Sequence, residues 1–108
     1  MRTSARETST LTPCPLACGW SGHPFKMLQE LDATFDAVAL IGWHGPVGDG
    51  GNPLSHTMTG RYARAELDGA PMSELVLHAH LAATIGVPVV FVSGDAALCA
   101  QAETLLPG

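Results

Sequence analysis

The chain has 108 residues, of which 46% are hydrophobic and 14% are charged, and its formal net charge at pH 7 is −5. This length fits one small domain, which buries about two thirds of the surface of its unfolded chain. The acidic balance argues against a nucleic-acid partner, and no apolar run is long enough to span a membrane. Because the charged content is low for a soluble domain, we expect apolar surface that further chain or a partner covers.

The first 22 residues show hydrophobic periodicity of neither a strand nor a helix, so we expect a disordered or loop-like tail at 1–22. Arg2 and Arg6 are not followed by the apolar run of a secretory signal, which favours a cytoplasmic protein.

Three cysteines are present, Cys14, Cys18 and Cys99. An odd count without a secretory signal predicts no disulfide framework. The spacing of Cys14 and Cys18 matches neither a zinc ribbon nor a thioredoxin motif, and we interpret them as two thiols in the tail.

Ordered structure is predicted from Pro24 onward. Pro24 at a helix start, followed by Phe25, Leu28 and Leu31 at spacings of three, predicts a short amphipathic helix. The continuous apolar run at 37–41 predicts a strand that is covered on both faces, as in a parallel sheet.

A long glycine-rich loop is expected at 42–60, and loops of this length in small domains usually have a function. Residues 61–67 alternate weakly and end at the turn dipeptide Asp68-Gly69, which predicts an edge strand or a hairpin strand.

The strongest helix prediction covers 71–85, with Ser73 or a residue just before it as the cap and Gly86 at the end. This helix is apolar almost all round, so it should be buried. A second buried strand is predicted at 87–92, and Asp95 should cap a last helix at 96–106.

This order of elements predicts an α/β fold, with a small open, mostly parallel sheet and flanking helices. Such a sheet has an unpaired edge, so we expect a chain that self-associates or is poorly soluble.

Two histidines and a glutamate are the candidate functional residues. His44 directly follows a predicted strand, where α/β proteins bind ligands, although a lone loop histidine is often structural. His56 lies among glycines, which allow close approach of a substrate. Glu74 is favoured by the helix dipole, but a buried carboxylate also requires a cation or hydrogen bonds. Two histidines and a glutamate form an ordinary zinc set, here without a compact local motif.

Other polar residues have simpler interpretations. His78 lies one turn beyond Glu74 and could bind a metal or pair with that glutamate. We expect His23 and His80 to be exposed, and a helix cap accounts for Asp95.

Five segments, in order and at similar spacing, together resemble the zinc-dependent D-aminopeptidases. These segments are Leu-Asp-Ala-Thr-Phe (31–35), Ile-Gly-Trp-His (41–44), Ser-His-Thr-Met (55–58), Met-Ser-Glu-Leu (72–75) and Val-Pro-Val-Val-Phe-Val-Ser-Gly-Asp (87–95). The resemblance covers 24–107 and corresponds to the central part of a family member. It divides the chain into a non-family tail, 1–22, and a partial D-aminopeptidase-like α/β domain, 23–108, incomplete relative to the family domain.

The resemblance implies a zinc ion bound by His44 and Glu74, with His56 acting in catalysis. His78 stands where the family usually has asparagine, and we assign it a supporting role beside the metal ligands. The implied reaction is hydrolysis of short peptides that begin with a D-amino acid, in a family that forms homo-oligomers. Zinc would polarise the peptide carbonyl, and His56 would move protons or attack.

This chain departs from the family pattern, because it contains no Asp-x-Glu pair and lacks a further ligand histidine. A catalytic zinc ion generally has three protein ligands, so we expect a fragment that is inactive by itself. Three alternatives stay open: a small metal-binding module, an inert interaction subunit, and an anion-binding domain that uses the glycine-rich loop at 48–51. That loop lacks the lysine and the spacing of known phosphate-binding loops.

Overall fold

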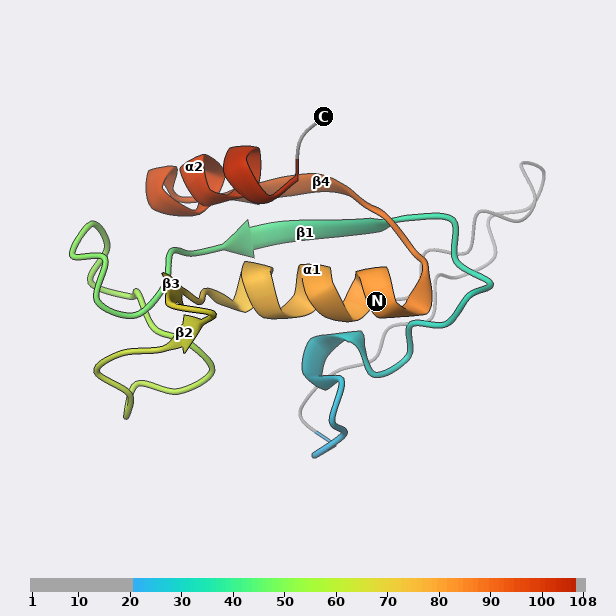
Figure 1. The fold of residues 1–108 in the computed structure, drawn as a ribbon, viewed down its shortest axis with the longest axis horizontal. Helices are drawn as coiled ribbons and strands as arrows, with labels where there is room; N and C mark the ends of the chain where they lie inside the picture. Colours follow the sequence, from blue (N-terminus) through green and yellow to red (C-terminus); the bar gives the residue numbers. More distant parts are fainter. Residues whose placement is uncertain (1–20, 107–108) are drawn as a thin grey trace.

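A computed structural model of the chain describes residues 21–106. The predicted disorder at 1–20 and the thiols of Cys14 and Cys18 lie outside the described residues. The elements in chain order are η1 (Lys26–Leu28), β1 (Val38–Trp43), β2 (Glu66–Leu67), β3 (Ala70–Pro71), α1 (Glu74–Ile85), β4 (Val89–Gly94) and α2 (Ala96–Leu105) (Figure 1).

Strands β1 and β4 pair in parallel, and α1 connects them. The ladder runs from the pair Val38 and Val89 to the pair Trp43 and Gly94, with two irregularities. One irregularity lies at Gly42, whose φ of 76° is a conformation that favours glycine. Its N–H donates to Ser93 Oγ at 3.2 Å, and the pairing of Trp43 with Gly94 carries β1 past the predicted end of the strand at residue 41. The predicted α/β fold with a small parallel sheet is confirmed.

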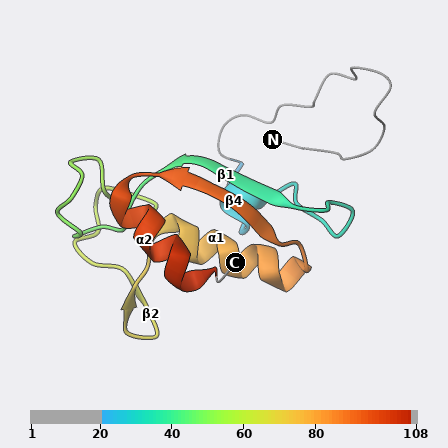
Figure 2. The same ribbon diagram turned by 90° about the horizontal axis from the view of Figure 1, so that it is seen from above.

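The prediction that both strands are covered on both faces is wrong for the part of the chain that the structure describes. Helices α1 and α2 lie on the same side of the two strands (Figure 2). Val38 and Leu40 point into the core, whereas Ile41 is 63% exposed, and so is Val90. The apolar runs correctly indicated strands that tolerate burial on both faces. They could not indicate whether other elements of this chain pack on both faces.

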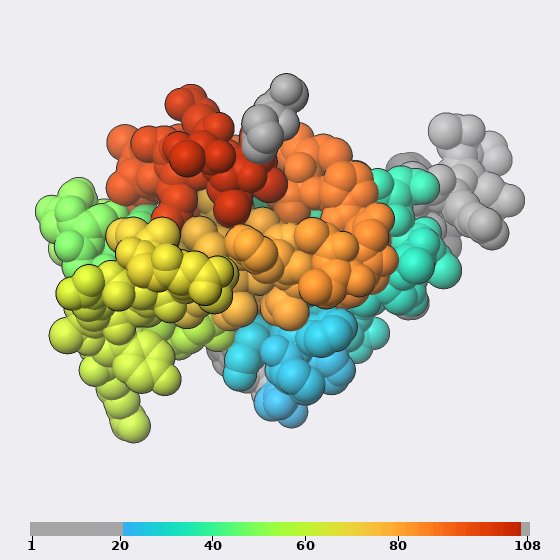
Figure 3. All heavy atoms as spheres, in the orientation of Figure 1, coloured from blue at the N-terminus to red at the C-terminus, as the bar shows by residue number. Residues whose placement is uncertain are grey.

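Helix α1 ends as the sequence predicted. Ser73 caps it by accepting a hydrogen bond from Val76 N at 3.3 Å, and Gly86 stops it in the left-handed conformation, with φ of 84°. The helix begins at Glu74 rather than at residue 71, because Pro71 belongs to β3. Figure 3 shows α1 in orange between α2 in red and the segment around η1 in blue.

The helix expected after Pro24 is a single 3-10 turn. Lys26 has a positive φ of 51°, and Phe25 provides no side-chain cap, so no α-helix starts there. The apolar spacing nevertheless indicated the buried side, because Leu28 belongs to the core and Leu31 packs against it.

The strand expected at 61–67 is reduced to β2, which pairs with β3 in an antiparallel hairpin. Asp68 and Gly69 both have positive φ, as in the tight turns that favour this dipeptide. The hairpin forms its own sheet and is not an edge of the parallel one.

One cluster of buried side chains joins the layers. It comprises Leu28, Val38, Leu40, Leu75, Ala79, Ala82, Val87 and Leu98. Beside it an open, mostly apolar groove of about 960 Å³ runs between α1, β4 and α2, away from the candidate functional residues. None of the helices in the described part of the chain has the length and apolar character needed to cross a membrane.

The end of α1 gives a test of the fold. Gly86 has open space around its Cα but a positive φ, so Gly86→Ala should lower the free energy of unfolding by about 1 kcal/mol through backbone strain alone. Gly60 also faces open space but has no positive φ, and Gly60→Ala should change stability little. Urea denaturation of both variants checks the difference, and equal stabilities would contradict the assigned helix end.

Candidate metal centre

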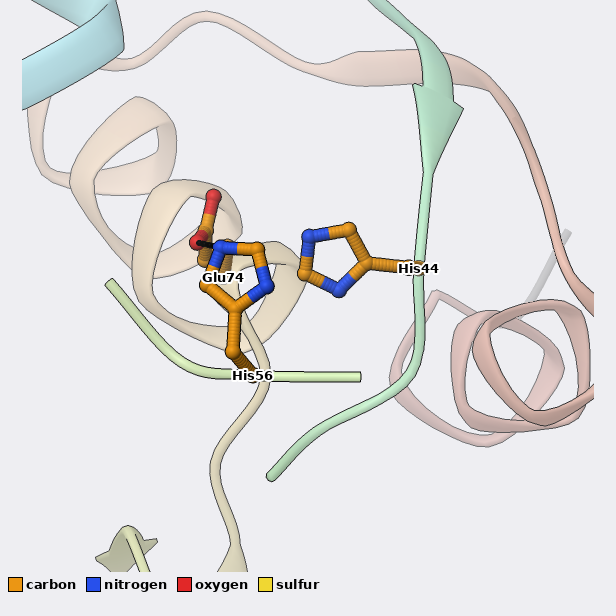
Figure 4. A group of neighbouring side chains, drawn as sticks. All are labelled: His44, His56 and Glu74. Atoms are coloured by element: carbon orange, nitrogen blue, oxygen red, sulfur yellow. Dashed lines mark ion pairs between the residues drawn. The ribbon is translucent and has the colours of Figure 1, made fainter. Parts of the chain in front are cut away.

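Three elements far apart in the sequence bring His44, His56 and Glu74 together. His44 follows the last residue of β1, His56 lies in the long loop, and Glu74 is the first residue of α1 (Figure 4). One potential ligand atom from each side chain lies within 4.8 Å of the other two. The sequence predicted this convergence, because a strand end and a helix start meet at one rim of an α/β sheet.

Both histidine rings are oriented by their own backbone. His44 Nδ1 lies 3.1 Å from Gly45 O, and His56 Nδ1 lies 2.8 Å from Leu54 O. A carbonyl oxygen accepts hydrogen bonds, so Nδ1 is the donor in each ring, which leaves Nε2 as the ring nitrogen that could bind a metal. The ring centroids are 4.3 Å apart with a tilt of 30°, so the two rings pack against each other.

Glu74 provides a nearly buried negative charge, because the residue is only 7% exposed. Its Oε1 accepts a hydrogen bond from Met58 N at 3.0 Å and lies 3.5 Å from His56 Nε2. Among the described residues, His56 is the one basic side chain within ion-pair distance of this carboxylate. The start of the helix favours the charge, but burial of a carboxylate with so few partners also suits a bound cation.

The loop that carries His56 is fixed by a buried threonine and a tight turn. Thr57 Oγ1 accepts from Val47 N at 3.2 Å and donates to Met72 O at 2.8 Å. Thr59 N donates to Thr57 O at 2.7 Å around Met58, whose φ is 62°. This is a γ-turn of the strained kind, and its central N–H is held by Glu74.

A family model described as D-aminopeptidase matches residues 14–108. The chain belongs to the D-aminopeptidase family. It is also 34% identical over 84 residues to a D-aminopeptidase of Bacillus subtilis (strain 168). That alignment covers 78% of this chain and 30% of the relative, so the chain spans about a third of the relative's length. No solved structure matches the chain.

The family match begins at residue 14, inside the segment 1–22 for which the sequence predicted no family resemblance. The division of the chain at residue 23 stays a prediction.

His78 is a third histidine close to the candidate metal centre. It is fully buried and packs against Trp43. Its Nδ1 lies 2.7 Å from Glu74 O, and its ring packs edge-on against Trp43 at 5.0 Å between centroids. Its Nε2 is buried with no hydrogen-bond partner among the described residues. Burial lowers the pKa of His78, although the hydrogen bond to Glu74 O and the charge of Glu74 oppose this shift. His23 and His80 are exposed, as expected.

The interpretation of Asp95 as a helix cap alone is wrong. The cap is present, since Leu98 N donates to Oδ1 at 2.9 Å, but Gly45 N and Asn52 Nδ2 also donate to the carboxylate. The hydrogen bond from Gly45 is the largest cause of a lowered pKa of Asp95, followed by those from Leu98 and Asn52. No local pattern could show the two added donors, because they come from 50 and 43 residues earlier in the chain.

The glycine-rich loop does not have the character of an anion site. Asp49 lies within it and accepts hydrogen bonds from Gly51 N at 2.8 Å and from Ser55 Oγ at 2.9 Å. The second oxygen of Asp49 is buried without a partner among the described residues. A carboxylate that already takes these donors repels an added anion, so the geometry disfavours the anion-binding alternative.

Burial of His78 predicts acid sensitivity of the metal-free protein. Its folded-state pKa lies below the usual 6.5, so the unfolded chain takes up the proton first as the pH falls. Stability should therefore be full above about pH 6.5 and decrease below it. Urea unfolding in the presence of a chelator, from pH 7 to pH 5, measures this slope. His78→Asn should flatten it, whereas His80→Asn, at an exposed position of the same helix, should not; equal slopes would contradict the assignment.

Proposed function

We propose that this chain carries a zinc-binding part of a D-aminopeptidase site, in which His44 and Glu74 bind the metal and His56 transfers protons. The observation that supports this most is the convergence of these three side chains from a strand end, a loop and a helix start. Membership of the D-aminopeptidase family supports the same roles.

The donor set suits zinc better than a hard cation. Imidazole nitrogen and carboxylate oxygen are ordinary zinc ligands, whereas calcium and magnesium prefer oxygen alone. Two ligands at about 2.1 Å from one ion lie at most about 4.2 Å apart. The ligand atoms here lie within 4.8 Å of one another, so a small side-chain adjustment brings them to one ion.

Exposure separates the proposed roles. The His56 side chain is 40% exposed, whereas that of Glu74 is 9% exposed. A proton-transfer group must reach both solvent and substrate, and a ligand carboxylate gains from burial. A bound zinc ion supplies Lewis-acid polarisation of the substrate carbonyl. His56 would take or give the proton at Nε2, and the carbonyl of Leu54 orients its ring.

The substrate class that we propose is a short peptide with an N-terminal D-amino acid, hydrolysed in the cytoplasm. This proposal depends on the family alone. The supporting role of His78 is to hold the first turn of α1 through Glu74 O.

By itself, we expect the chain to bind metal without turning over peptides. The sequence contains no Asp-x-Glu pair, and two ligands with water are fewer than a catalytic zinc site generally has. The second candidate function is therefore a metal-binding module without catalysis. An interaction subunit or a homo-oligomer is favoured by the exposed side chains of Ile41, Val90 and Phe91 on the sheet.

Metal binding is tested by competitive titration of zinc against a chromophoric chelator. His44→Ala and Glu74→Gln should each abolish detectable binding, because one remaining ligand does not retain the ion. His56→Ala should leave binding largely intact if His56 is a proton carrier. His80→Ala, at an exposed site on α1, is the matched control and should bind as the unchanged chain does. Loss of binding in His56→Ala would make His56 a ligand and contradict the assigned roles.

Catalysis is tested with a D-Ala-D-Ala dipeptide and the zinc-loaded chain. We expect no release of D-alanine above the rate of a zinc-only blank. Zinc-dependent turnover that disappears in His56→Ala would overturn the inactive assignment and would make the chain a minimal enzyme.

A further inference from the structure

Asp95 binds the backbone on both sides of His44. Asp95 N donates to Trp43 O at 3.3 Å, and Gly45 N donates to both carboxylate oxygens, at 3.1 and 3.0 Å. The residues before and after His44 are thus held by one residue that lies just after β4. The His44 ring is in turn oriented by Gly45 O, in the residue that Asp95 binds.

The same carboxylate also reaches the loop that carries His56. Asn52 Nδ2 donates to Asp95 Oδ2 at 2.9 Å, and Asn52 Oδ1 accepts from Leu54 N at 2.8 Å. Leu54 O is the acceptor that orients His56 Nδ1. Hydrogen bonds therefore connect Asp95 with both histidines through the backbone of Gly45 and of Leu54.

The backbone around these contacts is closely packed. A Cβ on Gly94 would collide with Trp43 O and with Leu98, and a Cβ on Gly45 would collide with the Asp49 carboxylate. Gly94 therefore allows the ends of β1 and β4 to approach more closely than another residue could, and Gly45 leaves room for the Asp49 carboxylate. A helix cap needs one acceptor for one N–H, and the Asp95 carboxylate serves three donor groups.

We propose that Asp95 is a positioning residue for the metal centre, fixing His44 through its two neighbours in the chain, Trp43 and Gly45, and His56 through Asn52. This inference rests on the proposed metal-binding function, but it adds that the affinity depends on a side chain that does not itself touch the metal. Residues that orient metal ligands typically change affinity by about 10- to 100-fold when they are replaced.

Asp95→Ser separates positioning from capping. Serine is as good a helix cap as aspartate, but its hydroxyl is one bond shorter and cannot serve Gly45, Asn52 and Leu98 together. We expect a melting temperature near that of the unchanged chain and a zinc affinity that is about tenfold weaker or more. In the metal-free protein, the Gly45 amide should exchange its hydrogen faster than in the unchanged chain. Glu103→Gln, exposed on the same helix, removes an equal charge and should alter neither quantity.

The outcomes distinguish this inference from the proposed function. If the unchanged chain binds no zinc, the proposed function fails, while the exchange of Gly45 in the metal-free protein still tests the positioning. Unchanged exchange of Gly45 in Asp95→Ser would overturn the inference. An unchanged zinc affinity in Asp95→Ser would also overturn the inference. A melting temperature that falls together with the zinc affinity would overturn it as well, because a joint decrease indicates a structural role only.

Discussion

The parallel pairing of β1 with β4 is the constraint on which the rest of the structure depends. It joins segments about fifty residues apart and requires α1 to cross back over one face of the sheet. Parallel strands end at the same rim, so His44 after β1 and Asp95 after β4 become neighbours. The connection also places the N-terminus of α1 at this rim, and with it Glu74. Without the pairing of β1 with β4, His44, Asp95 and Glu74 would not lie together at this rim.

Around this rim the protein holds polar groups in an apolar setting. Glu74 is nearly buried at the start of a helix that is apolar almost all round, and its side chain contacts Met58 N and His56 among the described residues. Met58 adopts a strained turn, and the bond to Glu74 helps to maintain it. Strain and an incompletely paired carboxylate are both typical of binding sites, and both fit a cation held by Glu74 together with His44.

The other side of the sheet has a different character. Ile41, Val90 and Phe91 are large, apolar and more than half exposed, while the helices cover the opposite face. The chain aligns with 30% of its Bacillus subtilis relative. An exposed apolar sheet face of this kind favours association, and the low charge content of the chain does little to oppose it.

Local patterns determined much of the fold. The apolar runs located both parallel strands, Ser73 and Gly86 marked the ends of α1, and Asp68-Gly69 marked the hairpin, because caps and turns depend on residues a few positions apart. The prediction of a helix after Pro24 was wrong because no capping residue starts a helix there. The apolar spacing in this segment reflects the core contacts of Leu28 instead.

The sequence indicated one part of the candidate site, and the tertiary structure decided the other part. The order of strand, loop and helix was enough to bring His44, His56 and Glu74 to one rim, because connectivity in an α/β unit determines which ends meet. Only the tertiary structure decided that His78 faces Trp43, that Asp95 binds Gly45 and Asn52, and that one face of the sheet stays exposed. These facts depend on contacts between segments distant in sequence, and no periodicity or spacing within one segment records which partner the chain will bring to it.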